Sequence, residues 1–132
     1  MDDPTSLLDG LKTGDVLLYR TTDLGAAFNA CVQGDTWSHV GLVVEATPEL
    51  ESLYASDYAG CGASTPERAK LAVFEAVVRR GVSLFPLEAR LARTVNSLRL
   101  VAVRKLIRGT FSSLDHQALH SFIKEVLGRP LE

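Results

Sequence analysis

Four apolar stretches of strand length divide the chain and predict a β-sheet. They run from Val16 to Arg20, from Ser38 to Glu45, from Leu71 to Val78 and from Leu98 to Ile107. The second stretch is rich in β-branched residues, and the third is apolar at nearly every position, which is typical of a strand buried on both faces. Strand alternation places His39, Gly41 and Val43 on one face of the second strand.

Apolar residues at helical spacing, together with capping residues, predict helices between and after these strands. We expect one helix that begins at Thr22 or Asp23 and ends at Gly34, one that follows Pro86 after an extended start at Gly81, and one that opens with the capping box Ser112-Ser113-Leu114-Asp115 and ends at Gly128. Short strands separated by helices indicate an α+β fold, and 132 residues suffice for a single domain spanning 1–132.

The region 46–70 follows neither periodicity. It contains Pro48, Gly60, Gly62 and Pro66, and it predicts a long, partly ordered loop of the kind that often forms a functional lid. Within it, Thr65 followed by Pro66 has the chemistry of a short helix start.

Composition and charge exclude several classes of function. The chain has 14 Lys plus Arg against 16 Asp plus Glu, so no positive field attracts nucleic acid. No apolar run approaches the roughly 18 residues of a transmembrane segment. The start, Met-Asp-Asp-Pro-Thr-Ser, lacks the pattern of a secretory signal, and we therefore expect a cytoplasmic location. Two cysteines are too few for a disulfide framework or a cysteine-rich zinc site.

Two polar residues stand out within the predicted sheet. His39 begins a strand beside Gly41, whose missing side chain leaves room for another backbone or a substrate. Glu75 interrupts an apolar strand, where an ionised carboxylate is costly without a partner. A histidine on a neighbouring strand suits it, because a carboxylate on one ring nitrogen fixes the tautomer and raises the basicity of the other. Alternatively, His39 bonds only within a strand end, and Glu75 lies at a sheet edge or pairs with Arg79 or Arg80.

Three motifs follow one another along the chain. They are Leu-Lys-Thr-Gly-Asp-Val-Leu-Leu-Tyr-Arg at 11–20, Trp-Ser-His-Val-Gly-Leu-Val-Val at 37–44, and Val-Phe-Glu-Ala with Gly-Val and Pro-Leu within 73–87. With these motifs in this order, residues 11–128 resemble the circularly permuted branch of the NlpC-type papain-like superfamily. This branch includes the YiiX-like cysteine hydrolases and the lecithin-retinol acyltransferases. The resemblance implies a half-barrel antiparallel sheet packed against helices, and a Cys-His-Glu site with His39 as general base and Glu75 as its orienting acid.

The residues expected around this site are Tyr19, Trp37, Ser38 and Gly41, which we predict to line the pocket. Ser38 neighbours His39 in a strand and therefore points to the opposite face, which excludes it as a serine nucleophile for that histidine.

The sequence departs from the family pattern at the nucleophile. The resemblance places the nucleophilic cysteine after the histidine, near the start of a helix that follows the barrel strands, but no cysteine follows Cys61. We interpret the chain either as truncated before the nucleophile helix or as a non-catalytic relative. Cys31 is expected to pack in the core. Cys61, between two glycines, could reach His39 only through movement of the loop, which opposes preorganisation.

His116 and His120 are four residues apart on the last predicted helix, a spacing that can hold a metal. Because no HExxH pattern or third ligand accompanies them, we predict a solvated helix flank and no metal site.

The function expected from these residues and the resemblance is a cysteine hydrolase or acyltransferase, such as a peptidase or amidase. It would act on amide or ester bonds of a peptide or lipid-like substrate and need no cofactor. We expect a longer parent chain to be the enzyme and the 132 residues alone to be inactive. The alternatives are a non-catalytic binding or scaffold module of the same fold, and self-association through an uncovered sheet face.

Overall fold

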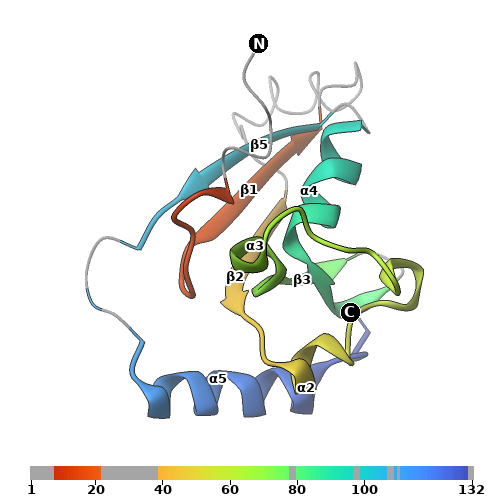
Figure 1. Ribbon diagram of the computed structural model, residues 1–132. Helices are drawn as coiled ribbons and strands as arrows, with labels where there is room; N and C mark the ends of the chain where they lie inside the picture. Colours follow the sequence, from red (N-terminus) through yellow and green to blue (C-terminus); the bar gives the residue numbers. More distant parts are fainter. Residues whose placement is uncertain are drawn as a thin grey trace, which may run out of the picture.

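The computed structural model describes residues 8–21, 39–77, 80–96, 99–106, 109 and 111–130. Its centre is a five-stranded antiparallel sheet in the order β4-β3-β2-β1-β5 (Figure 1). The strands are β1 (Val16–Thr21), β2 (His39–Glu45), β3 (Leu71–Val77), β4 (Gly81–Pro86) and β5 (Arg99–Arg104). The helix expected between Thr22 and Gly34, with Cys31, lies outside the described residues, as do Trp37 and Ser38.

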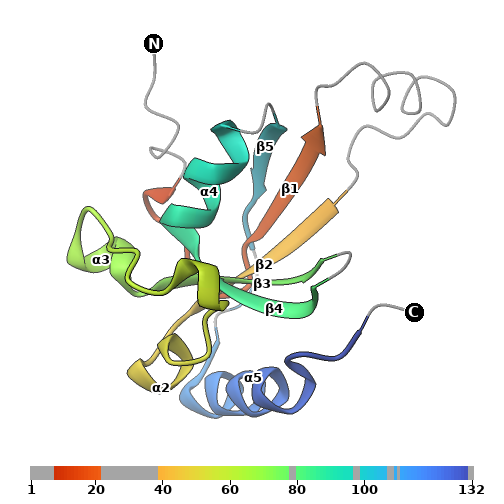
Figure 2. The ribbon, with the colours of Figure 1, turned by 90° about the vertical axis from the view of Figure 1, so that its right-hand side faces the viewer.

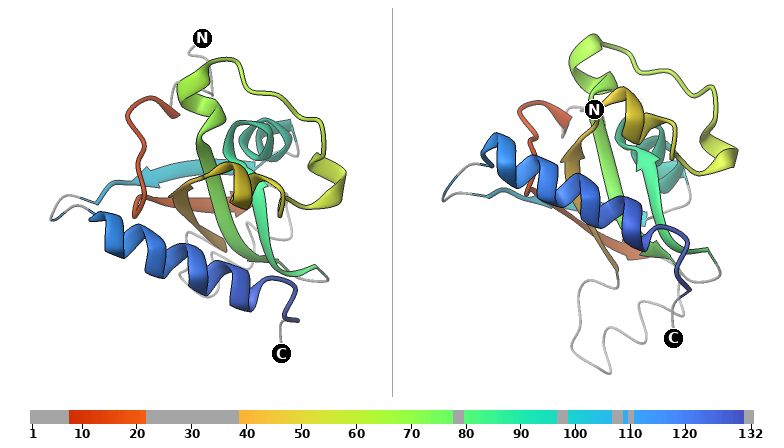
Figure 3. Two further views of the ribbon diagram at one scale, coloured as in Figure 1. Left: turned by 60° about the horizontal axis from the view of Figure 1, so that its bottom comes forward. Right: turned by 90° about the horizontal axis from the view of Figure 1, so that it is seen from below.

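Helices cover both faces of this sheet. They are α2 (Pro48–Glu51), the 3-10 helix η2 (Ser56–Tyr58), α3 (Pro66–Ala69), α4 (Leu87–Asn96) and α5 (Ser113–Val126). Helix α4 lies on one side of the sheet, whereas α5 runs along the other (Figures 2 and 3). The expected α+β class is therefore confirmed, as is the helix start after Pro86.

Alternation along the strands produces two separate cores. The core under α4 contains side chains from β1, β2, β3, β4 and the helix, among them Leu17, Tyr19, Val43, Val73, Phe85 and Leu91. On the opposite face, the core contains Val44, Ala72 and Leu84 together with Leu50 of α2 and Ile123 of α5. Because neighbouring residues of one strand enter different cores, each strand is held in a single register.

Asp15 fixes the turn that leads into β1. It is fully buried, its Oδ2 accepts a hydrogen bond from the Lys12 amide at 3.0 Å, and its Oδ1 accepts one from the Leu106 amide at 2.7 Å. The carboxylate therefore joins the entrance of β1 to the chain that leaves β5, which gives the Gly-Asp of the first motif a structural explanation.

The structure differs from the sequence interpretation in two places. The segment after Gly81 is a complete strand that pairs with β3 over its whole length, rather than only an extended start to a helix. The region 46–70, expected to be a partly ordered loop with one short helix start, contains three short helices, and its Leu50 and Tyr58 are 0% and 2% exposed. The expected helix start at Thr65 is confirmed, since its side chain accepts a hydrogen bond from the Arg68 amide.

The last helix begins as the sequence predicts. Ser112 and Asp115 form the capping box, with each side chain accepting a hydrogen bond from the other residue's backbone amide. Beyond α5, the Val82 amide donates to the Arg129 carbonyl and the Gly128 amide donates to the Val82 carbonyl, both at 2.9 Å. Through these two hydrogen bonds, the segment after α5 covers the outer edge of β4.

We predict that Leu50 anchors the region 46–70 to the sheet. Leu50→Ala removes a fully buried side chain and should lower the free energy of unfolding by about 2–5 kcal/mol in urea titrations. The matched control is Leu53→Ala in the same region, because Leu53 is 38% exposed and should change stability by less than about 1 kcal/mol. Equal, small effects of both substitutions would contradict an anchored segment.

Candidate functional site

The predicted contact between His39 and Glu75 is present. The Nε2 atom of His39 lies 2.7 Å from Oε1 of Glu75. His39 is the first residue of β2, and Glu75 lies within β3. The Glu75 side chain has no exposed surface, whereas that of His39 is 25% exposed. The site therefore combines a buried acid with an imidazole that solvent reaches.

Sheet register brings these groups together on the face that carries α4. Tyr19 of β1 is the direct cross-strand partner of His39, and their rings lie 5.2 Å apart between centroids. The β2–β3 register pairs Leu42 with Phe74, and the next pair in the same register joins Gly41 to Glu75. The ends of three adjacent strands therefore meet at one place.

Gly41 makes this approach possible. A Cβ atom at this position would lie 2.6 Å from Cγ2 of Val73 and 3.0 Å from Cγ of Glu75. The space beside the backbone, which we expected to admit another chain or a substrate, is thus filled by β3 side chains. The glycine serves the packing of Glu75 against β2.

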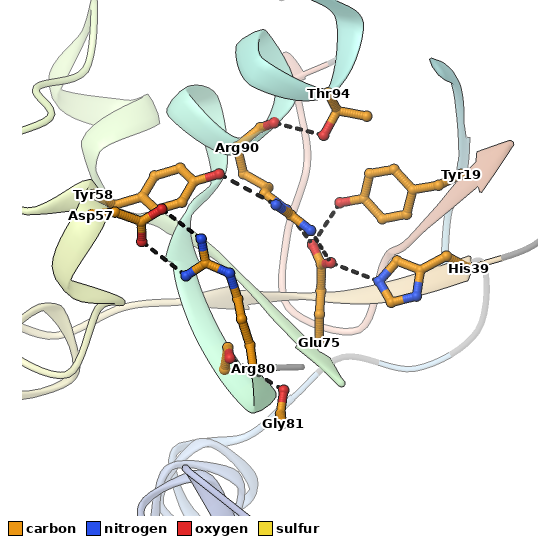
Figure 4. A network of polar contacts seen from close by, with 10 residues as sticks. Tyr19, His39, Asp57, Tyr58, Glu75, Arg80, Gly81, Arg90 and Thr94 are labelled. Atoms are coloured by element: carbon orange, nitrogen blue, oxygen red, sulfur yellow. Dashed lines mark hydrogen bonds and ion pairs between the residues drawn. The ribbon is translucent and has the colours of Figure 1, made fainter. Parts of the chain in front are cut away.

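Two further residues donate hydrogen bonds to Glu75 (Figure 4). The Tyr19 hydroxyl donates to Oε2 at 2.7 Å. Arg90 of α4 donates through Nη2 to Oε1 at 2.9 Å and through Nε to Oε2 at 3.2 Å. Both carboxylate oxygens are therefore occupied by donors, which matches the acceptor capacity of an ionised carboxylate.

The electrostatic balance at Glu75 favours the ionised form. Burial raises the pKa of its carboxyl, but hydrogen bonds from His39 and Arg90, the Arg90 charge and the Tyr19 hydroxyl together hold that pKa below its ordinary value. Burial, reinforced by the Glu75 charge, raises the pKa of Tyr19, so that its hydroxyl stays protonated and acts as a donor. Burial lowers the pKa of Arg90, but its bonds to Glu75 outweigh that effect and raise it.

These charges assign the imidazole tautomer. An ionised carboxylate can only accept, so the Nε2 atom of a neutral His39 carries the proton that is shared with Glu75. Nδ1 then holds the lone pair. A neutral imidazole in this tautomer can accept a proton from a neighbouring group, which is the chemistry of a general base.

A groove of about 670 Å³ lies between the sheet and α5, and its lining includes His39 and Gly41. Its wall is mainly apolar, with Val40, Leu42, Phe74, Phe122 and Val126 among the lining residues. Leu42 and Phe74 belong to the core under α5, so the groove lies on the opposite face of the sheet from the His39 side chain. Tyr19, which we expected in the pocket wall, is 1% exposed and lies in the core under α4. Trp37 and Ser38, the other two expected wall residues, lie outside the described part of the chain.

The sequence interpretation missed Arg90. Its side chain is 13% exposed, its guanidinium stacks on Phe85 at 4.3 Å from the ring centroid, and its Nη1 donates to the Tyr58 hydroxyl at 3.3 Å. The sequence contained a pattern that points to Arg90, because this residue lies between Leu87 and Leu91 on the apolar side of its helix. A charge on that side requires an opposite charge in the sheet.

Arg80 does not pair with Glu75, contrary to one alternative considered above. Its guanidinium binds the Asp57 carboxylate, which holds the pKa of Asp57 below its ordinary value. Arg79 lies outside the described residues.

Cys61 lies apart from His39. It is exposed and lines a cavity of about 480 Å³ with Tyr54, Tyr58, Arg68 and Glu88, and neither His39 nor Glu75 belongs to that wall. Its sulfur lies 3.7 Å from Nη2 of Arg93. The structure thus does not bring Cys61 to the imidazole.

The two histidines of α5 face Glu45 at the end of β2. The Nε2 atom of His116 lies 3.5 Å from Oε2 of Glu45, and that of His120 lies 3.1 Å from the Glu45 carbonyl oxygen. Within the described ranges, no three histidine, cysteine, aspartate or glutamate side chains form a group that could hold a metal ion. None of the described helices has the length and apolar character needed to cross a membrane.

Comparisons of this chain with protein-family models, curated proteins and solved structures give no significant match.

We predict that Gly41→Ala destabilises the fold through the site. The added Cβ must displace Val73 or Glu75, and overpacking of this kind costs about 1–3 kcal/mol. Urea unfolding should show the loss, and the nuclear magnetic resonance (NMR) signals of the His39 ring should shift. Gly62→Ala is the control, because no atom lies close to a Cβ built there. If Gly41→Ala had no more effect than Gly62→Ala, the close packing of β2 on Glu75 would be contradicted.

Acid should remove the contribution of Glu75 to stability. Because its pKa in the folded protein lies below the ordinary value of 4.5, the ionised group stabilises the fold above that pH, and the contribution is lost as the pH falls through the lowered pKa. Glu75→Gln should cost about 3–5 kcal/mol at neutral pH, since Arg90 stays buried without its anion.

Urea unfolding at stepwise lower pH measures this effect. The stability difference between the wild-type protein and Glu75→Gln should shrink below pH 4.5. Glu125→Gln is the control, because the Glu125 side chain is 71% exposed and should give a small difference at every pH. A constant, large difference for Glu75→Gln down to roughly pH 2 would contradict an ionised Glu75.

Proposed function

We propose that this chain supplies the base and the orienting acid of a cysteine hydrolase or acyltransferase of the permuted NlpC-type papain-like class. The observation that carries the proposal is the partly exposed imidazole of His39, whose Nε2 lies 2.7 Å from the buried Glu75 carboxylate. With an ionised carboxylate, this contact leaves the lone pair of a neutral ring on Nδ1. A carboxylate-oriented imidazole is the base of such thiol sites. The ordered motifs at 11–20, 37–44 and 73–87 support the same class.

In the proposed reaction, Nδ1 of His39 takes the proton of a thiol, and the thiolate attacks the carbonyl carbon of an amide or ester. The tetrahedral adduct collapses to a thioester as the protonated imidazole returns that proton to the leaving amine or alcohol. Water or an acceptor alcohol or amine then attacks the thioester, with His39 again taking and returning a proton. Each step conserves protons, and the thiol is regenerated.

The nucleophile is proposed to come from outside the 132 residues. Cys61 lines a different cavity, so its thiol is a poor candidate. The apolar groove under α5 lies on the opposite face of the sheet from the His39 side chain, so its wall does not define the substrate. The proposed substrate class is therefore an amide or ester of a peptide or lipid-like molecule, as the ordered motifs imply.

The alternative is a binding module of the same architecture. It is favoured by one observation, namely that no cysteine among the described residues contacts His39. In this case Nδ1 would accept a hydrogen bond from a ligand N–H or O–H that approaches the imidazole, and no covalent bond would form.

The test is acyl transfer by the protein expressed from its whole natural gene. Hydrolysis of activated aliphatic and aromatic esters and thioesters should fall roughly a hundredfold to ten-thousandfold in kcat for His39→Ala. His120→Ala is the matched control, since His120 bonds the Glu45 carbonyl and should keep the wild-type rate. Equal rates for all three proteins, or no labelling of any cysteine by an acylating probe, would overturn the enzymatic proposal in favour of the binding module.

A further inference from the structure

Among the described residues, Arg90 is the one full positive charge that contacts Glu75 when His39 is neutral. It comes from α4, the helix that packs on this face of the sheet, and it binds both carboxylate oxygens. The other described titratable groups that face the carboxylate are Tyr19 of β1 and His39 of β2, and Tyr58 faces Arg90 from η2. Ser83 of β4, the cross-strand partner of Glu75, carries no charge.

The position of Arg90 is itself fixed by its surroundings. Phe85 lies under the guanidinium, the Tyr58 hydroxyl accepts from Nη1, and the Arg90 carbonyl accepts from the Thr94 hydroxyl at 2.8 Å. A guanidinium held on both sides presents its donors to Glu75 in one geometry. Glu75 therefore cannot turn its carboxylate without breaking two charge-assisted hydrogen bonds.

We propose that Arg90 is a positioning residue that decides which nitrogen of the His39 ring is the base. By keeping Glu75 ionised, Arg90 makes the carboxylate an acceptor, which requires the proton on Nε2 and leaves Nδ1 free. This inference rests on the proposed function, since it assigns a role within the same site.

The opposite state shows why the charge matters. Without Arg90, burial favours the neutral carboxylic acid, which takes a proton from solvent and gains an O–H donor. Two acceptors lie 2.7 Å from the carboxyl oxygens, Nε2 of His39 at Oε1 and the Tyr19 hydroxyl at Oε2, and a proton on Oε1 is donated to Nε2. The ring would then carry its proton on Nδ1, and the nitrogen needed for the proposed chemistry would have no lone pair.

The same charge gives Glu75 a defined role toward the imidazole. Because Arg90 compensates the carboxylate charge and binds both of its oxygens, Glu75 acts as a hydrogen-bond acceptor of fixed direction for the His39 ring.

Nuclear magnetic resonance of the 15N-labelled 132-residue chain tests this inference without any substrate. In the wild-type protein, the neutral His39 ring should give the signals of the Nε2–H tautomer, assigned by their loss in His39→Ala. In Arg90→Met, these signals should shift toward the Nδ1–H tautomer, and the 13C-carboxyl titration of Glu75 should move to higher pH. Arg90→Lys, which restores a positive charge, should return the Nε2–H signals.

The control is Arg93→Met, one turn further along α4, where the guanidinium binds Asp57 and stacks on Tyr58. It should leave the His39 tautomer unchanged. A folded Arg90→Met protein that keeps the Nε2–H tautomer and an ionised Glu75 would overturn the inference.

If Arg90→Met does not fold, the wild-type and Arg90→Lys spectra still test the inference. An Nδ1–H tautomer of neutral His39 in the wild-type protein would overturn it. An Nε2–H tautomer in the wild-type protein, together with a folded Arg90→Lys protein that shows the same tautomer, would support it. Failure of acyl transfer in the activity assay would leave all these spectra unchanged, so the two proposals fail separately.

Discussion

The buried carboxylate of Glu75 is the constraint on which the rest of the site depends. Its side chain has no exposed surface, yet it stays ionised because Tyr19, His39 and Arg90 all donate to it. Apolar residues of similar volume would fill such a place at no greater cost in stability. Folding alone therefore does not require the cluster, and its structural effect is to hold the partly exposed His39 ring in one orientation.

Sheet topology supplies the three donors from separate elements. Antiparallel pairing sets Tyr19 opposite His39, and a slip of one residue in β2 would turn His39 to the face covered by α5. Gly41 then allows Glu75 to lie close against β2, and α4 follows β4 directly, which brings Arg90 over the same point. The fold and the charges are therefore interdependent, because the register positions the charges and the charges fasten α4 to the sheet.

The sequence predicted the parts of the fold that local patterns determine. Strand alternation identified the central strands and the face shared by His39 and Gly41, and capping chemistry placed the start of α5. A costly glutamate in an apolar strand pointed to His39 as its partner. The short helices α2 and η2 were missed because three or four residues carry little periodicity, and burial of Leu50 and Tyr58 holds these two helices against the sheet.

Arg90 escaped prediction for a different reason. Its partner Glu75 lies 15 residues earlier, on a different element, and the pattern within either element alone does not relate the two charges. Each of them was visible as an anomaly in its own element. A buried acid in a strand and a cation on the apolar side of a helix each require an opposite charge, so matching the two anomalies would have predicted the pair from the sequence alone.

The choice between an enzyme and a binding module depends on the group that meets Nδ1 of His39. In the proposed Nε2–H tautomer, this nitrogen is an acceptor in either case. A thiol placed there would lose its proton and become a nucleophile, whereas an amide or hydroxyl would keep its proton and form a hydrogen bond. The proposed tautomer is thus compatible with both proposed functions, and the acidity of the group that meets Nδ1 distinguishes them.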